Sequence, residues 1–430
     1  MNETSAFVLS CSVNGTGGVG RSYALGIDYG TSGVRGAVLE IGARPLRPIV
    51  RQVNLRGVDG AQSWTHALCD LLDEFPSELR GGIRRVAVDG TSASIIYDGA
   101  VKMYNHAEPE EVVEKIRQVT PPGHTVASAT SSLAKIVGWG ATADFEHQAD
   151  FITRLLLGSQ HRTSDWNNAL KMGFDPEQEA WPEWLSSLLP LNAFMDVKRP
   201  GEVVGNADPT WGFADGCLVV AGTTDSIAAF IASGATKLRE SCTSLGSSLA
   251  LKLLSDVRVD DSKFGIYSHR YFMNSEDGSP LWLVGGASNV GGRTLKELGF
   301  SGADIASLSD EMDLNTPLSK DLKLYPLPPG SRGERFPIND PNLAPALERG
   351  GTSDVEYLRS LLDSIAEVER RGFTLLEEYG APYPTVVYSA GGGAYNPTYS
   401  KIRERKLGVP VRIGDSTEAC VGAALLAEFG

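Results

Sequence analysis

Cysteine is scarce in this sequence, and its few copies form no recognisable pattern. The 430 residues contain five cysteines, an odd number, and none of them makes a Cys-x-x-Cys pair. This excludes a disulfide framework and a zinc-binding cluster, and it indicates a protein of a reducing compartment. The six histidines are scattered without the spacing of metal ligands, so we interpret them as structural residues.

Long apolar runs and basic runs are also missing. No uninterrupted apolar stretch reaches the roughly 18 to 20 residues that a membrane span needs, and the most apolar region, residues 218–235, is interrupted by Asp225. Lys and Arg total 39 against 53 Asp and Glu, which gives a net charge of −14. This balance argues against a nucleic-acid backbone or a membrane surface as a partner, and it favours small-molecule ligands.

What the sequence does contain is the material of a large folded core. It is 42% hydrophobic and holds 48 glycines, and its length predicts roughly two to three domains. Residues 1–22 differ, because they are rich in Ser, Gly and Asn and show no helix or strand period. We interpret them as a disordered leader or the remnant of a transit peptide, with an ordinary frayed terminus as the alternative.

Two short loops each place one carboxylate among small residues just after a strand-like run. They are residues 25–33 (LGIDYGTSG) and residues 221–225 (AGTTD). A strand that ends in Asp and continues Gly-Thr-Ser-Gly gives a tight turn with free backbone N–H groups and hydroxyls, which can approach phosphate oxygens closely. The aspartate cannot bind an anion, so it is expected to hold a cation or accept a proton. Two such loops suggest a cleft between two domains, with a nucleotide and a second substrate in it.

Hydrophobic periodicity supports two similar α/β halves. Each half combines a hairpin around a Gly/Ser/Thr turn with later strands and helices, which is a weak internal repeat. The main predicted strands and hairpins span 23–28 with 34–41, 84–89, 217–221, 241–254, 265–273, 281–285, 385–389 and 410–413. The main predicted helices span 64–75, 131–139, 151–157, 226–233, 355–379 and 418–429.

The order of the motifs resembles that of the FGGY family of carbohydrate kinases, from about residue 25 to residue 429. The matching segments are 28–35 (DYGTSGVR), 89–92 (DGTS), 165–169 (DWNNA), 221–225 (AGTTD), 245–247 (LGS), 333–337 (GERFP) and 390–396 (AGGGAYN). The resemblance implies two actin-like, ribonuclease H-like domains with an ATP/sugar cleft between them. It also implies a sugar-binding domain at residues 23–216 and a nucleotide-binding domain at residues 217–430.

A closer resemblance is to the short pentulose kinases of plants and cyanobacteria that phosphorylate D-ribulose. Residues 221–235, 243–247 and 331–341 carry this match. It implies conversion of D-ribulose to D-ribulose 5-phosphate, with ATP and Mg²⁺ as cofactors. It further implies a chloroplast stromal protein, with the cytoplasm as the alternative, that is a monomer or a homodimer. One departure stands out: the Trp-x-Asp-x-Arg segment that many family members carry reads Met103-Tyr104-Asn105-His106-Ala107 here.

The resemblance and the charge requirements of phosphoryl transfer together imply specific roles. Asp225 is the expected general base, with Asp28 as the second catalytic carboxylate and both near Mg²⁺, which they would contact through water. The expected sugar ligands are Asp28, Ser32, Gly33, Ser92 and Asp225. The expected ATP ligands are Thr31, Gly246, Ser247, Gly392, Gly393, Asn396 and Tyr399, of which Tyr399 offers a stacking face to adenine.

Each of these positions has a plainer structural interpretation. Asp28 and Ser92 are also suitable turn residues, and Asp225 is a suitable helix N-cap. Residues 391–393 also suit an ordinary strand-to-helix turn, Tyr399 suits core packing, and Arg35 suits a structural ion pair. Three functional alternatives stay open: a kinase for D-xylulose or another ketose or polyol, an actin-like or chaperone-like ATPase that drives a protein partner, and a weakly active sugar sensor.

Overall fold

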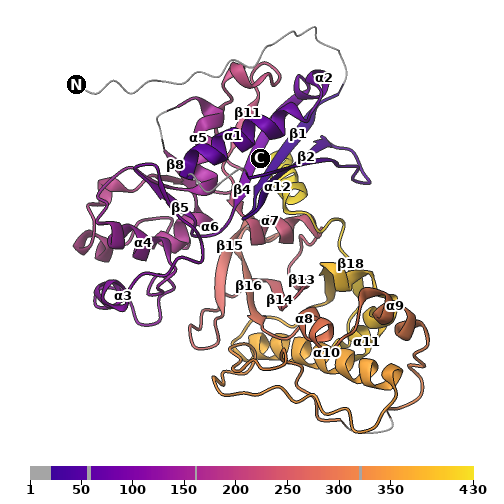
Figure 1. Ribbon diagram of the computed structural model, residues 1–430. Coiled ribbons are helices and arrows are strands. Elements are labelled where there is room, and N and C mark those ends of the chain that lie inside the picture. Colours follow the sequence, from indigo (N-terminus) through magenta and orange to yellow (C-terminus); the bar gives the residue numbers. More distant parts are fainter. Residues whose placement is uncertain (1–20, 56–59, 160–161, 319–321) are drawn as a thin grey trace. The chain divides into compact units, whose positions relative to one another are not determined.

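The computed structural model describes residues 21–55, 60–159, 162–318 and 322–430. The chain divides into two compact units (Figure 1). The first unit comprises Met1–Thr120, Val126–Ala229 and Glu418–Gly430, and the second comprises Pro121–Thr125 and Phe230–Thr417. The chain passes from one unit to the other within helix α7 (Asp225–Ala232).

The first unit is built on a mixed seven-stranded sheet with the order β10-β11-β4-β1-β2-β3, where β12 also pairs with β4. Strand β1, between β4 and β2, has no exposed residue, which is typical of a strand covered on both faces. Strands β1 and β2 form an antiparallel hairpin, whereas β1 and β4 run parallel. The strands are β1 (Tyr23–Tyr29), β2 (Gly33–Glu40), β3 (Ile49–Asn54), β4 (Ile83–Gly90), β10 (Val203–Asn206), β11 (Leu218–Val220) and β12 (Thr223–Thr224).

Helices and two small sheets complete the first unit. The helices are α1 (Gly60–Asp73), α2 (Ser77–Arg80), α3 (Glu110–Arg117), α4 (Ser132–Trp139), α5 (Gln148–Leu157), α6 (Trp166–Ala169) and α12 (Ala419–Phe429). The additional strands are β5 (Ile95–Tyr97), β6 (Ala100–Lys102), β7 (Phe145–His147), β8 (Thr163–Asp165) and β9 (Asp196–Lys198). The apolar faces of α1 and α5 pack on the main sheet and form its core.

The second unit repeats this design. Its six-stranded sheet has the order β15-β16-β14-β13-β17-β18. The strands are β13 (Glu240–Leu245), β14 (Leu249–Ser255), β15 (Tyr267–Asn274), β16 (Pro280–Ser288), β17 (Val386–Ala390) and β18 (Val411–Ile413). The helices are α8 (Gly292–Glu297), α9 (Gly302–Asp310), α10 (Asp354–Glu378) and α11 (Pro397–Leu407). The amphipathic α10 lies along α11 and buries its apolar face in the second core (Figure 1).

The two sheets have equivalent topology over five strands. In each, three adjacent antiparallel strands (β1, β2 and β3, or β13, β14 and β16) are followed by two strands that add in parallel on the other side of the first (β4 and β11, or β17 and β18). In the second sheet, β15 lies between β14 and β16 in the sequence and pairs with the far side of β16. This arrangement confirms the expected pair of related α/β domains of the actin-like, ribonuclease H-like kind. It also explains why the two Gly/Ser/Thr turns, at 30–32 and 246–248, connect equivalent strands.

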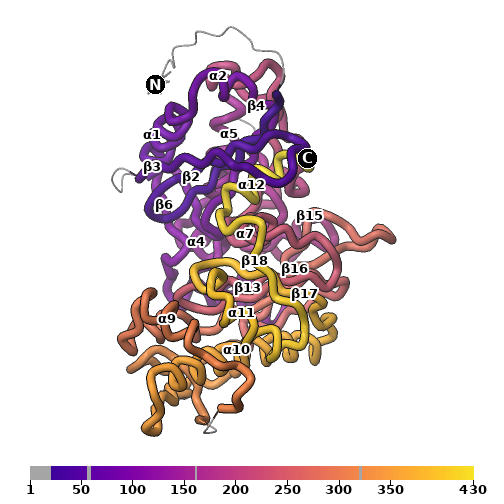
Figure 2. The backbone as a smooth tube through the Cα atoms, turned by 90° about the vertical axis from the view of Figure 1, so that its right-hand side faces the viewer, coloured from indigo at the N-terminus to yellow at the C-terminus, as the bar shows by residue number. Residues whose placement is uncertain are grey.

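The C-terminal helix belongs to the first unit. Figure 2 shows α12 lying against β1 and β2. The close approach depends on Gly26, because a Cβ there would lie 2.1 Å from the backbone nitrogen of Ala424. The sequence assigned residues 217–430 to one domain, whereas the contacts place 217–229 and 418–430 in the first unit. The predicted leader, residues 1–22, lies outside the described residues except for Arg21 and Ser22.

In the described part of the chain, no helix is both long and apolar enough to cross a membrane. The longest, α10, carries charged residues along one face, which fits a helix packed on a core and exposed to water.

Candidate functional site

Three carboxyl groups gather where the central strands of the first unit end. Asp28 of β1 and Asp89 of β4 are register partners on adjacent parallel strands, and Thr223 of β12 is the partner of Asp89 on the other side. Residues in register point to the same face of a sheet, so Asp28 and Asp89 share one face. Asp225 follows Thr223 by two residues and interacts electrostatically with Asp89. The sequence analysis did not select Asp89 as a site residue.

Burial raises the pKa of two of these carboxyl groups, those of Asp28 and Asp89. Asp89 is fully buried, and its pKa is raised well above the usual range, first by burial and then by the neighbouring charges of Asp28 and Asp225. Burial likewise raises the pKa of Asp28, whereas its interaction with the Asp89 side chain and the charge of Arg35 act in the opposite direction. The two carboxyl oxygens of Asp89 make no hydrogen bond to a described residue.

Arg35 forms a structural ion pair at the edge of this cluster. Its guanidinium lies 3.8 Å from the Asp28 carboxylate and 3.6 Å from that of Glu418, and its Nε donates to Gln52. These pairs support the interpretation of Arg35 as a structural ion-pair residue. They give partial charge compensation to Asp28, a buried residue that is 5% exposed.

Asp225 begins helix α7, and its carboxylate accepts a hydrogen bond of 2.6 Å from the backbone nitrogen of Ser226. This contact joins the carboxylate to the next residue, inside the first turn of the helix. It differs from an N-cap bond, which would run to a nitrogen two or three residues on. The side chain is only partly buried, unlike that of Asp89.

The first small-residue turn is open to solvent. Thr31 and Ser32 are exposed between β1 and β2, and the turn is closed by a hydrogen bond from Gly30 N to Gly33 O of 3.0 Å. A side chain at Gly33 would put its Cβ 2.7 Å from the Val53 carbonyl oxygen, so only glycine fits there. The hydroxyls and backbone of this turn are available to a ligand.

The loop after β4, residues 91–94, is fixed from two sides. The Oε1 atom of Gln148 accepts hydrogen bonds from Thr91 N (3.1 Å) and Thr91 Oγ1 (2.9 Å). The buried Lys135 donates to the carbonyl of Ala93 over 2.8 Å, and Ala93 has a φ of 67°, a left-handed conformation uncommon for a residue with a side chain. Burial lowers the pKa of Lys135 to about 8. These contacts hold Ser92 in place.

Asp165 fixes the segment that resembles a sugar-site segment of kinases. Its carboxylate accepts from the backbone nitrogens of Asn167 (2.8 Å) and Asn168 (3.0 Å) and so caps α6. Asn167 in turn donates to Thr223 Oγ1 over 3.0 Å, beside Asp89. Burial, followed by the charge of Asp150, raises the pKa of Asp165.

Several buried polar atoms of the first unit have no hydrogen-bond partner among the described residues. Around the strand ends they are both carboxyl oxygens of Asp89, Ser92 Oγ, Gln148 Nε2, Asn167 Oδ1 and Thr224 Oγ1. Native proteins satisfy nearly all buried polar groups, so a local group of unsatisfied donors and acceptors points to a polar ligand or ordered water. The mixture of donors and acceptors suits a molecule with several hydroxyl groups.

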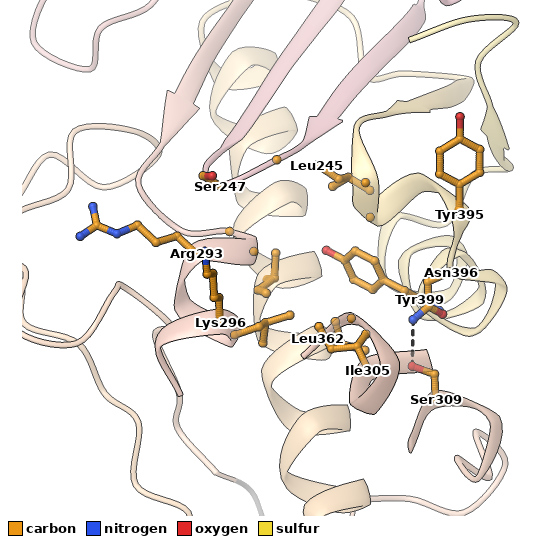
Figure 3. Close-up of a pocket in the computed structure, with 18 of the residues that line it drawn as sticks. Leu245, Ser247, Arg293, Lys296, Ile305, Ser309, Leu362, Tyr395, Asn396 and Tyr399 are labelled. Atoms are coloured by element: carbon orange, nitrogen blue, oxygen red, sulfur yellow. Dashed lines mark hydrogen bonds between the residues drawn. The ribbon is translucent and has the colours of Figure 1, made fainter. Parts of the chain in front are cut away.

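The second unit holds a cavity of about 980 Å³, shown in Figure 3. Six predicted ATP-binding residues line it: Gly246, Ser247, Gly392, Gly393, Asn396 and Tyr399. The seventh, Thr31, belongs to the first unit. Much of the remaining wall is apolar and comes from Leu245, Leu249, Leu295, Ile305, Leu362 and Ile365. The volume suits a nucleotide-sized ligand.

Glycines let two segments of the cavity wall, at residues 291–292 and 391–393, pack closely on the β13–β14 turn. Gly391 has a φ of 79°, and a Cβ there would lie 2.8 Å from the Leu245 carbonyl oxygen. On the other side, Gly292 N donates to Gly246 O over 2.8 Å, and a Cβ at Gly291 would lie 2.7 Å from Ser247 O. The β13–β14 turn therefore packs between two glycine segments, which leave its backbone accessible.

Asn396 and Tyr399 have structural tasks as well as places in the cavity wall. The Asn396 side chain caps α11 by accepting from Tyr399 N (2.9 Å) and donates to Ser309 Oγ over 2.8 Å (Figure 3). The Tyr399 ring is 5% exposed and points into the cavity, and its hydroxyl has no hydrogen-bond partner in the described residues. Burial raises the pKa of this hydroxyl, so it stays protonated.

The described residues contain no group of three or more His, Cys, Asp and Glu side chains arranged to hold a metal ion. Mg²⁺ does not need such a group, because it keeps several waters and is commonly bound by one or two carboxylates together with substrate phosphates. Asp28 and Asp225 fit that mode of binding, since both are aspartates beside a phosphate-type turn.

The family model "FGGY family of carbohydrate kinases, C-terminal domain" matches residues 242–430. This part of the chain is therefore similar to the C-terminal domain of FGGY carbohydrate kinases. The whole cavity of Figure 3 lies within it. The sequence had indicated three of its loops but not residues 291–310, whose helices α8 and α9 supply Arg293, Lys296 and Ser309 to the wall. Their short, glycine-interrupted pattern gave no helical signal.

Solved structures of kinases named for xylulose, gluconate and glycerol share the fold over nearly the whole chain. The xylulose kinase of Rhodospirillum rubrum is 20% identical with a TM-score of 0.77, and the match covers 95% of this chain and 90% of that chain. A gluconate kinase of Lactobacillus acidophilus is 16% identical with a TM-score of 0.73, covering 95% and 89%. The glycerol kinase of Plasmodium falciparum, solved with ADP, is 14% identical with a TM-score of 0.73, covering 95% and 89%. These likenesses confirm the fold of two actin-like domains.

Proposed function

We propose that this protein is an ATP-dependent pentulose kinase that converts D-ribulose to D-ribulose 5-phosphate, with D-xylulose as the next candidate acceptor. The observation that carries the proposal is the group of unsatisfied polar atoms at the strand ends of the first unit, Asp89 among them. The same chain matches the C-terminal domain of FGGY carbohydrate kinases over residues 242–430 and holds a nucleotide-sized cavity there. One unit supplies hydrogen bonds for a polyol, and the other supplies a site for ATP.

In this proposal the nucleotide occupies the cavity of the second unit. The apolar wall receives the base, with the Tyr399 ring as a packing surface, and Gly392 and Gly393 leave room for it. The exposed backbone of Gly246 and the hydroxyl of Ser247 bind phosphate oxygens, as does Thr31 of the first unit. Asn396 holds its loop in place through the cap on α11 and lies beside the base.

Asp225 is the proposed general base. Transfer of the γ-phosphoryl group requires in-line positioning and compensation of negative charge more than covalent assistance. A carboxylate fixed by Ser226 N can orient the attacking sugar hydroxyl and accept its proton as the new bond forms. Asp28 binds the sugar from the end of β1, where Asp89 is its register partner on β4 and Arg35 lies 3.8 Å from its carboxylate.

The sugar is held by hydrogen bonds from Asp28, Ser32, Gly33, Ser92 and Asp225. Ser92 is suited to this role because its buried hydroxyl has no partner in the described residues and its loop is fixed by Gln148 and Lys135. When bound with ATP, Mg²⁺ compensates the charge of the phosphate oxygens. Asp28 and Asp225 are its proposed ligands, through water.

The proposal is tested by an assay of ADP release with Mg²⁺ and ATP across ketoses, aldoses and polyols, with a reaction that contains no sugar as the control. We expect release to be fastest with D-ribulose, slower with D-xylulose and negligible without sugar. Equal release with and without sugar would contradict the kinase and favour an ATPase that drives a protein partner. Binding of sugar and ATP without release would favour a sugar sensor.

We propose the chloroplast stroma as the location, on the basis of the composition of residues 1–22. A fusion of these residues to a fluorescent protein, expressed in plant cells, tests this. Import into plastids supports the proposal, and fluorescence confined to the cytoplasm contradicts it. The proposed assembly state, monomer or homodimer, is tested by sedimentation of the full chain.

A further inference from the structure

Gln148 occupies an unusual position for a glutamine. It is fully buried at the start of α5, beside the loop that follows β4. Its backbone nitrogen donates to the carbonyl of Ser94 over 3.0 Å, so the residue is attached to this loop through both its backbone and its side chain. A Cβ at Gly90 would lie 3.1 Å from Gln148 Oε1, which shows that the glutamine side chain packs directly on the strand residue after Asp89.

The hydrogen bonds of Thr91 determine how the Gln148 amide is oriented. Thr91 N is a backbone donor, so the atom 3.1 Å from it must be an acceptor, the amide oxygen. The Thr91 hydroxyl donates to the same oxygen over 2.9 Å and accepts from the Ser94 hydroxyl, which in turn accepts from Tyr104 N. Each of these groups is satisfied, and the orientation of the amide is therefore fixed.

The amide nitrogen of Gln148 is consequently left with two N–H donors and nothing to receive them. Nε2 is buried and has no hydrogen-bond partner within residues 21–55, 60–159, 162–318 and 322–430. A buried donor without an acceptor costs more than a hydrogen bond gains, so such a group is retained when something else satisfies it. The loop that Gln148 contacts through Thr91 also carries the unsatisfied Ser92 Oγ, and the strand before that loop carries the unsatisfied Asp89 carboxyl oxygens.

We propose that Gln148 is a specificity-determining residue that donates a hydrogen bond from Nε2 to an oxygen of the acceptor sugar. The inference rests on the proposed function and deepens it. Asn167 Oδ1 offers an acceptor, whereas Gln148 Nε2 offers two donors. A site with both hydrogen-bond donors and acceptors suits a neutral polyol or ketose. The oxygens of such a sugar accept hydrogen bonds, and its hydroxyl groups donate them. The site selects against acceptors that lack an oxygen at the contacted carbon.

The first test compares Gln148→Glu and Gln148→Met with the wild-type enzyme. Glutamate keeps an oxygen that can accept the hydrogen bonds from Thr91 but replaces the Nε2 donor with a second oxygen. Methionine has a similar volume and removes both polar atoms. For each variant we expect the KM for D-ribulose to rise on the order of tenfold to a hundredfold, with the KM for ATP within about twofold of wild type. If Gln148→Glu fails to fold, Gln148→Met carries the test. Gln118→Glu, on an exposed glutamine, is the matched control and is expected to change neither constant.

A second variant separates sugar binding from loop support. Thr91→Val removes one of the two hydrogen bonds to Gln148 Oε1 and keeps the amide in place. If Gln148 only supports the loop, Thr91→Val and Gln148→Met will raise the sugar KM to a similar extent, and this result would overturn the inference. If Gln148 contacts the sugar, the effect of Thr91→Val is expected to be several times smaller.

Monodeoxy pentuloses provide the decisive comparison. With the wild-type enzyme we expect one deoxy position to lower kcat/KM by tenfold or more, and we expect this particular loss to disappear in Gln148→Met while losses at other positions remain. Unchanged discrimination at every position in Gln148→Met would overturn the inference and leave the kinase assignment intact. Failure of the wild-type enzyme to phosphorylate any sugar would overturn the proposed function and this inference together.

Discussion

Asp28 and Asp89 are register partners on adjacent parallel strands, so their carboxyl groups lie on the same face of the sheet. Burial raises the pKa of both carboxyl groups, and the neighbouring charges of Asp28 and Asp225 raise the pKa of Asp89 further. The raised pKa favours the protonated form of the fully buried Asp89, whose two carboxyl oxygens make no hydrogen bond to a described residue. The chemistry of the site therefore depends on a residue that has no access to solvent.

The proton on Asp89 leads to a prediction about stability and pH. Because the pKa of Asp89 is raised in the folded state, the folded protein holds this proton more tightly than the unfolded chain does. Its contribution is therefore fully present below the unfolded pKa of about 4 and is lost progressively as the pH rises toward the folded value. Asp89→Asn, which stays neutral, is expected to be more stable than wild type above about pH 4, by a margin that grows with pH.

Thermal unfolding of the ligand-free proteins between pH 4 and pH 8, with EDTA present, measures this margin. A gain of 1 kcal/mol corresponds to roughly 2 to 4 °C in Tm for domains of this size. Asp215→Asn, on an exposed turn, is the control and is expected to follow wild type. A constant difference between Asp89→Asn and wild type across this range would show that Asp89 is already charged in the folded protein.

The proposed general base gives a sharper kinetic prediction. Asp225→Asn is expected to lower kcat for sugar phosphorylation by about a hundredfold to ten-thousandfold, because the amide cannot accept the proton of the attacking hydroxyl. ATP affinity, measured by calorimetry, is expected to stay within about twofold, since the cavity is built from residues 245–399. Asp215→Asn serves again as the control. Retained sugar turnover in Asp225→Asn would remove the role assigned to this residue.

The left-handed glycine beside the nucleotide cavity predicts a loss of binding. Gly391→Ala combines a strained backbone with a Cβ that would lie 2.8 Å from the Leu245 carbonyl, so the β13–β14 turn must move. We expect ADP affinity to fall by at least about tenfold. Gly408→Ala is the matched control, because Gly408 also has a positive φ of 72° but open space around its Cβ position. Equal effects of the two substitutions on ADP affinity would contradict this explanation.

A buried ion pair beneath the nucleotide loops predicts a large cost in stability. Arg403 and Glu369 are both fully buried and joined by two hydrogen bonds of 2.7 Å, and Thr243 and Ser389 bond to the same pair. Arg403→Met leaves the Glu369 carboxylate buried without its cation, and we expect the free energy of unfolding to fall by about 3 to 5 kcal/mol. Urea denaturation measures this change.

The control for the ion pair is Lys406→Met, which breaks the partly exposed pair with Asp363 at 2.8 Å. Exposed pairs contribute at most about 1 kcal/mol, so this variant is expected to stay close to wild type. The double variant Arg403→Met/Glu369→Leu removes both charges and is expected to recover much of the loss. If Arg403→Met proves as stable as Lys406→Met, the buried pair contributes nothing to the free energy of unfolding.

The sequence was sufficient to predict the two hairpins and their turns. A strand followed by Gly, Thr and Ser has few alternative conformations, and the residues around Gly30 and Gly246 form the expected turns. The long amphipathic helix near residue 365 was also predictable, because its apolar positions recur with the helical period. These features depend on local pattern alone.

Other features depend on contacts distant in sequence and could not be predicted. The C-terminal helix belongs to the first unit because Gly26 lets it approach β1, which no local pattern reveals. The sequence pattern places Asp89 at the end of a buried strand and gives it no role. Its register with Asp28 is what identifies it as a site residue. Gln148 belongs to no sequence motif. Its unsatisfied amide nitrogen can be identified only in the structure, where the hydrogen bond from Thr91 fixes the position of the amide oxygen.

The fold leaves the choice of acceptor to local side chains. Kinases named for xylulose, gluconate and glycerol share the fold of this chain at 20% identity or less. The residues around Asp89, Ser92 and Gln148 are thus where selectivity is expected to reside, particularly because the Trp-x-Asp-x-Arg segment is absent from residues 103–107.

The most direct test of the kinase assignment is identification of the product by phosphorus NMR after incubation with ATP, Mg²⁺ and D-ribulose. The account predicts one new phosphomonoester signal, that of D-ribulose 5-phosphate, formed in a one-to-one ratio with ADP and absent when sugar or enzyme is omitted. ADP accompanied by inorganic phosphate alone, at the same rate with and without D-ribulose, would contradict it.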